Sequence, residues 1–92
     1  MIKSFKHKGL KKFFYEGKTQ GINPGHINKV SDILDMLDAA HDPRDMNYPG
    51  SGFHPLNPKA DKIYAVSVSG AWRITFKFED GDAYIIDYRQ YH

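Results

Sequence analysis

The stretch 63–88, IYAVSVSGAWRITFKFEDGDAYIIDY, decides the fold, because apolar and polar residues alternate along three successive segments of it. Alternation with a period of two is typical of strands that bury one face. Gly70-Ala71 and Asp80-Gly81 separate the segments, and Asp-Gly is a strong signal for a tight hairpin. The sequence therefore predicts a three-stranded antiparallel meander.

The middle segment of this meander predicts which side chains face the core and which face away from it. We expect the core face to carry Trp72, Ile74, Phe76 and Phe78, and the opposite face Arg73, Thr75 and Lys77. In the last segment Tyr84, Ile86 and Tyr88 are expected to share one side. A sheet face with protruding cations could hold a phosphodiester, and Arg73 could grip it with two N–H groups. Alternatively, Arg73 and Lys77 are ordinary outward-facing strand residues.

The residues upstream of the meander have helical periodicity instead. Leu10, Phe13 and Phe14 share a face at i, i+3 and i+4, which predicts a helix over 7–16 that ends at Gly17. A second helix is expected from Pro24 to residue 40, with an apolar stripe of Ile27, Val30, Leu34 and Leu37. Residues 1–5 alternate like a short strand. Together these elements predict an α+β fold: a short N-terminal strand, two helices and the meander.

Length and composition are those of one compact domain over residues 1–92. The chain has no cysteine, which excludes disulfides, thiol nucleophiles and thiolate metal sites. No apolar run reaches the roughly 18–20 residues that cross a bilayer, and residues 1–3 do not begin a signal peptide. We therefore expect a cytoplasmic protein with no membrane partner.

The net charge is only +2, but the charges are unevenly distributed. Residues 1–30 hold seven lysines and one acid, and this basic end could meet phosphate or simply form a solvated face. Asp32, Asp35 and Asp38 recur along one flank of the second predicted helix. These aspartates could attract a basic partner, pair with the lysines, or be solvated.

The histidines do not have the spacing of a helical metal site, and we expect no metal and no cofactor. His7 and His26 lie near predicted helix starts and are expected to be exposed. His54 stands late in the irregular stretch 41–61, and long loops of this kind are more often functional than idle. His92 directly follows Tyr91. Imidazole exchanges protons near neutral pH, so His54 and His92 are candidates for proton transfer.

Several short motifs, taken in order, resemble the HigB branch of the RelE/ParE toxin superfamily. They are MIKSFKHKGL at 1–10, HPL at 54–56, WRITF at 72–76, GDAYI at 81–85 and YH at 91–92, and the stretch 64–76 looks like the central hairpin of the superfamily. The resemblance implies the toxin of a type II toxin–antitoxin module, which enters the A site of the 70S ribosome and cuts the messenger RNA there. It also implies a HigA-like helix-turn-helix antitoxin as the partner. The toxin would then be linked to operator DNA only indirectly, through this antitoxin.

The same resemblance implies which residues form the active site. The implied catalytic residues are His54, Arg73, Tyr91 and His92. We expect the two histidines to move protons and Arg73 to clamp the phosphate, without a metal. Further contacts to RNA or the ribosome are expected from Lys59, Lys77, Lys8, Lys11 and Lys12.

Four positions depart from the pattern of the family. Asn57 stands where many relatives carry lysine, Gln90 stands where many carry an acid, and the strand before Trp72 has Ser67 and Ser69 where relatives place an arginine. Two other interpretations remain open. One is a ParE-like toxin that binds a protein such as DNA gyrase, and the other is a noncatalytic binding subunit.

Overall fold

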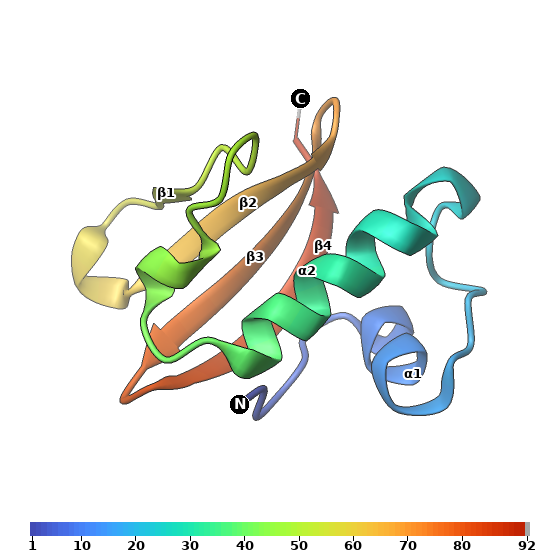
Figure 1. Cartoon of the computed structure of the whole chain (residues 1–92), viewed down its shortest axis with the longest axis horizontal. Coiled ribbons are helices and arrows are strands. Elements are labelled where there is room, and N and C mark those ends of the chain that lie inside the picture. Colours follow the sequence, from blue (N-terminus) through green and yellow to red (C-terminus); the bar gives the residue numbers. More distant parts are fainter. Residues whose placement is uncertain (92) are drawn as a thin grey trace.

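The computed structural model describes residues 1–91, and its helices lie on one side of an antiparallel sheet (Figure 1). The helices are α1 (Lys8–Glu16) and α2 (Ile27–Ala39), with short 3₁₀ turns at Pro24–His26, Pro43–Met46 and Lys59–Asp61. The strands are β1 (His54–Pro55), β2 (Ile63–Ser69), β3 (Trp72–Glu79) and β4 (Asp82–Gln90), in the spatial order β1-β2-β3-β4. The predicted α+β class, both helices and the three-stranded meander are confirmed.

The expected N-terminal strand is wrong, and the fourth strand of the sheet is β1 instead. Residues 1–6 lie beside β4, but they form only two isolated parallel bridges, Ile2 with Ala83 and Phe5 with Ile86. Between these bridges the Ser4 hydroxyl accepts the N–H of Ile85 at 2.9 Å. A side chain thus takes the place of a backbone partner, so a continuous ladder does not form.

The expectation that Tyr84 shares a side with Ile86 and Tyr88 is also wrong, because β4 contains a bulge. The pairing of β3 with β4 shifts register between Thr75 and Lys77, and Ile85 has a left-handed backbone with φ of 46°. An inserted residue reverses the alternation of the strand. Ile86 and Tyr88 are therefore buried, whereas Tyr84 lies opposite Lys77.

The core lies between α2 and the helix-facing side of the sheet. Ile74, Phe76 and Phe78 are buried and Trp72 packs against them, which confirms the predicted core face of β3. The helix side of the core is formed by Val30, Ile33, Leu34 and Leu37. Phe76 is completely buried, and truncation of such a side chain to alanine costs about 3–5 kcal/mol.

Both helix starts and the end of α1 are fixed by identifiable residues. Gly17 ends α1 in the left-handed conformation with φ of 72°, as predicted. His7 begins α1, and its Nδ1 accepts the N–H of Leu10 at 3.0 Å, so this ring is a cap. Pro24 begins the 3₁₀ turn that leads into α2. Neither α1 nor α2 has the length and apolarity needed to span a membrane.

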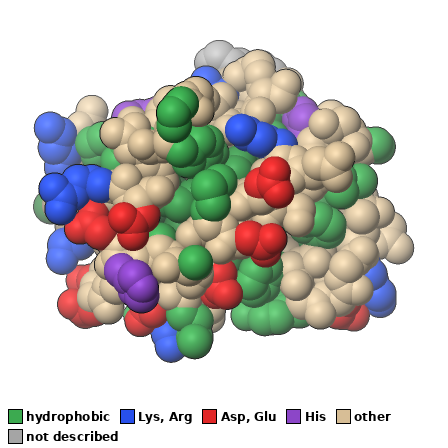
Figure 2. Space-filling view, in the orientation of Figure 1, with side chains coloured by type: hydrophobic (Ala, Val, Ile, Leu, Met, Phe, Trp, Pro, Cys, Tyr) green, Lys and Arg blue, Asp and Glu red, His purple; other side chains and the backbone are tan. Residues whose placement is uncertain are grey.

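The aspartates of α2 lie on its exposed flank (Figure 2). Asp38 Oδ1 accepts the backbone N–H of Ile2 at 2.8 Å and so holds the N-terminal segment against α2. Within residues 1–91, the ion pairs do not join Asp32, Asp35 or Asp38 to a lysine. Asp38 therefore has a structural role, and Asp32 and Asp35 face solvent.

Candidate active site on the open face of the sheet

The sheet face turned away from the helices brings His54 and Arg73 to the same side. His54 on β1 pairs with Ala65 on β2, which in turn pairs with Thr75 on β3. Residues directly opposite one another on neighbouring strands point to the same side of a sheet. Arg73 lies two residues from Thr75 and so shares its face, with its Cα about 12 Å from that of His54. This surface, here called the open face, is formed by His54, Ala65, Ser67, Arg73, Thr75, Lys77, Asp87 and Arg89.

The floor of the open face is made of small side chains. Ala65 and Thr75 are buried, and Ser67 is half-buried beside Arg73. The longer side chains of neighbouring positions rise around this floor. Because Ala65 and Thr75 are covered, an RNA backbone on this face would meet the longer charged side chains that surround them.

Arg73 and Tyr91 both hydrogen-bond to the turn between β2 and β3. One Nη of Arg73 donates to the carbonyls of Gly70, at 2.5 Å, and Trp72, at 2.9 Å. The backbone N–H of Tyr91 donates to the carbonyl of Ala71, at 2.9 Å. The turn therefore orients the guanidinium, and its remaining N–H groups can bind an anion.

His54 is exposed, and its hydrogen bonding defines which ring nitrogen is available. Its Nδ1 lies 2.8 Å from the carbonyl oxygen of Gly52. Because a carbonyl oxygen only accepts, Nδ1 carries the proton in the neutral ring and Nε2 is left as the proton acceptor. His54 is thus arranged to receive a proton at Nε2. Within residues 1–91, His, Asp and Glu side chains do not gather in threes that could hold a metal ion.

An aromatic stack of half-buried Trp72 on buried Tyr88 supports this end of the sheet from the helix side. The rings of Trp72 and Tyr88 are stacked with centroids 4.6 Å apart, and His26 packs on Trp72 at 5.5 Å. The Nδ1 of His26 lies 2.6 Å from the Tyr88 hydroxyl oxygen. Burial raises the pKa of Tyr88 above its ordinary value, although the Asn23 N–H that donates to its hydroxyl opposes this. His26 is buried, so the expectation that it is exposed is wrong.

The predicted lysines are not gathered at this site. Lys77 lies on the open face, but its Nζ is 3.6 Å from Glu79 Oε2, and Lys59 is exposed in the 3₁₀ turn before β2. The other three, Lys8, Lys11 and Lys12, are exposed on α1.

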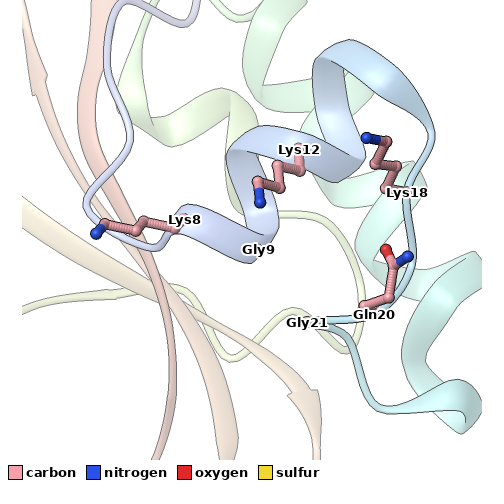
Figure 3. Close-up of a pocket in the computed structure, with 6 residues that line it drawn as sticks. All are labelled: Lys8, Gly9, Lys12, Lys18, Gln20 and Gly21. Atoms are coloured by element: carbon pink, nitrogen blue, oxygen red, sulfur yellow. The ribbon is translucent and has the colours of Figure 1, made fainter.

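A hollow of about 410 Å³ lies between α1 and the segment that follows it, with Lys12 and Lys18 on its two sides (Figure 3). Lys8 and Gln20 also line it. Gly9 and Gly21 let the two segments approach there, because a Cβ on Gly21 would lie 2.7 Å from the Cα of Gly9. The basic residues therefore form two separate surfaces, one on the open face and one beside α1.

Sequence reasoning missed Arg89. It pairs directly with Arg73 across β3 and β4, and its guanidinium carbon lies 5.2 Å from the centre of the Tyr91 ring. Its position two residues before Tyr91 was the available signal, since alternation puts both on one face. The remaining predicted catalytic residue, His92, lies outside the described residues.

The amino-acid sequence of this small α+β domain matches a known family. The family model described as RelE-like toxin of type II toxin-antitoxin system HigB matches residues 3–92. Endoribonuclease HigB of Proteus vulgaris is 41% identical over 92 residues, which cover all of both chains. An uncharacterized protein of Haemophilus influenzae is 30% identical over 80 residues, covering 85% of this chain and 79% of its own. The chain therefore belongs to the HigB-like toxins of type II toxin–antitoxin systems, as its motifs predicted, and an antitoxin partner follows from this membership.

Proposed function

We propose that this protein is a ribosome-dependent endoribonuclease that cuts messenger RNA by metal-independent acid–base catalysis. The observation that carries the proposal is the shared face of His54 and Arg73, with Tyr91 held at the adjoining turn. The relationship to a protein named as an endoribonuclease supports cleavage of RNA as the activity.

The reaction needs a base, a cation and an acid. Nε2 of His54 takes the proton of the ribose 2′-hydroxyl, and the oxygen attacks the adjacent phosphorus in line. The bond from phosphorus to the 5′-oxygen breaks, and His92 donates the proton that this leaving oxygen takes up. The products are a 2′,3′-cyclic phosphate and a 5′-hydroxyl. The tautomer of His54 supports its assignment as the base.

Arg73 stabilises the charge that develops on the phosphorane. Its orientation by the carbonyls of Gly70 and Trp72 means that little reorganisation is needed during the reaction. Tyr91 stacks on or hydrogen-bonds to a nucleotide beside the cleaved bond. Lys59 and Lys77 add positive charge along the path of the RNA.

The ribosome positions the message on this face. The site is open, so the toxin alone holds RNA weakly, and orientation by the ribosome can lower the barrier by several kcal/mol. The lysines of α1 contact ribosomal RNA on a separate surface, and a helix-turn-helix antitoxin covers another part of the protein. Reversing the charge of Lys8, Lys11 and Lys12 should weaken ribosome association in a salt-dependent way.

The test is primer extension on message translated in the presence of the parent protein and of single variants. His54→Ala, Arg73→Ala and His92→Ala should each reduce cleavage by about 10²–10⁴-fold. His41→Ala is the matched control, because this exposed histidine lies outside the site and should cut like the parent. Growth arrest by the parent without any cleavage would contradict the proposal and favour a toxin that binds a protein target.

A further inference from the structure

Two arginines stand directly opposite each other on the open face. Arg73 of β3 and Arg89 of β4 are register partners, which places their Cα atoms about 5 Å apart. Like charges in this arrangement destabilise a sheet. Such a pair is therefore expected where an anionic ligand lies between the two charges.

Neither guanidinium is fully neutralised by the described residues around it. Arg73 donates to the carbonyls of Gly70 and Trp72, which carry no net charge. Arg89 Nε lies 3.9 Å from Asp87 Oδ2, at the limit of an ion pair. The other oxygen of Asp87 accepts the N–H of Tyr88 at 3.0 Å. The carboxylate of Asp87 is thus a distant partner for Arg89 and is partly engaged by the backbone.

Arg89 is also held in place by an aromatic ring. Its guanidinium carbon lies 5.2 Å from the centre of the Tyr91 ring, a distance at which a cation is attracted to the ring face. The side chain is about half exposed, so its N–H groups remain accessible. Arg89 therefore stands between Arg73 and Tyr91 as an oriented, solvent-accessible cation.

We infer that Arg89 is a second phosphate-binding residue. Arg73 holds the phosphate that is cleaved, Arg89 holds the neighbouring phosphodiester of the same single strand, and Tyr91 stacks on the base between them. Two guanidiniums on adjacent strands fix both the position and the direction of the RNA backbone. This inference deepens the proposed ribonuclease function and rests on it.

The experiment compares Arg89→Gln with Arg73→Gln and with the matched control Arg44→Gln, which removes the same charge from an exposed position in the 3₁₀ turn Pro43–Met46. Binding of the full chain to a fluorescent 2′-O-methyl RNA oligonucleotide, which has no attacking hydroxyl, is measured from 50 to 300 mM salt, roughly the range over which phosphate contacts are screened. Arg89→Gln should bind about tenfold more weakly, and its slope of log affinity against log salt should be shallower by about 0.7. Arg44→Gln should follow the parent.

Cleavage of translated message by the same proteins separates the inference from the proposed function. A parent that cuts message while Arg89→Gln keeps the parent's affinity and salt slope would overturn the inference alone. A parent that does not bind the oligonucleotide would overturn it as well. A parent that binds with an Arg89-dependent slope but leaves the message intact would support the phosphate contact and overturn the ribonuclease.

Discussion

The Nδ1 of His26 lies 2.6 Å from the hydroxyl oxygen of Tyr88, and this contact ties the start of α2 to the last strand of the sheet. Both residues are buried. Tyr88 lies three residues before Tyr91, so the contact also fixes the strand that carries one side of the candidate site.

Tyr88→Phe should therefore lower the free energy of unfolding by about 1–2 kcal/mol, because it leaves a buried imidazole nitrogen without its partner. For a domain of this size, each kcal/mol corresponds to about 4–8 °C in Tm. Thermal and urea denaturation measure this change. An unchanged Tm would show that the hydrogen bond contributes nothing to stability.

Tyr48→Phe should have the opposite effect. The Tyr48 hydroxyl is buried and has no hydrogen-bond partner among the described residues, although Lys29 Nζ lies 5.2 Å from the centre of its ring. Removing this hydroxyl relieves a desolvation cost and keeps the ring, so stability should rise by about 1 kcal/mol. The same urea titration compares both variants, and a loss of stability in Tyr48→Phe would contradict this account.

Ionisation of the phenols of Tyr48 and Tyr88 should lower the free energy of unfolding at alkaline pH. Burial raises the pKa of both above the ordinary value of 10.0, and the charge of Asp32 raises that of Tyr48 further. Because the pKa of each phenol is raised in the folded state, its contribution to the free energy of unfolding is complete below about pH 10. This contribution is lost as the pH rises through the folded-state pKa. The double variant Tyr48→Phe, Tyr88→Phe should show a shallower decline of the free energy of unfolding above pH 10. A slope equal to that of the parent would contradict this prediction.

Local patterns were sufficient to predict most of the fold. The alternation from Trp72 to Phe78 and the helical end at Gly17 each depend on a few neighbouring residues, and both predictions are confirmed. The burial of His26 depends on Tyr88, sixty-two positions away, and no local pattern contains that contact. The isolated bridges of Ile2 and Phe5 likewise depend on how the distant strand β4 is shaped.

In the candidate site, too, some features follow from local patterns and others depend on contacts that are distant in the sequence. The outward direction of Arg73 follows from strand alternation, whereas the pairing of Arg89 with Arg73 needs the register of two strands. That register contains a bulge at Ile85, and a β-branched residue is a poor local signal for a left-handed backbone. The same bulge explains why strand alternation predicted the wrong side of the sheet for Tyr84.

Ile85→Asn should stabilise the protein, because asparagine tolerates the left-handed conformation that costs isoleucine about 1–2 kcal/mol. The Ile85 side chain is 44% exposed, so little apolar burial is lost. Ile86→Asn is the control, since Ile86 is fully buried and this variant should lose several kcal/mol of stability. Urea denaturation of both variants checks the difference, and a destabilised Ile85→Asn would mean that the bulge does not strain this residue.

Arg89→Glu should separate stability from function at the open face. A glutamate opposite Arg73 replaces a like-charge pair by an opposite-charge pair worth about 0.2–1 kcal/mol, and this gain should exceed the repulsion between the new carboxylate and Asp87, so that the free energy of unfolding rises. The same change places a carboxylate where we infer that the second phosphate binds, so affinity for RNA and cleavage of translated message should fall more than in Arg89→Gln. Denaturation and primer extension measure the two effects on the same protein. A variant that is both less stable and fully active would show that the two arginines do not repel each other and that Arg89 does not bind the message.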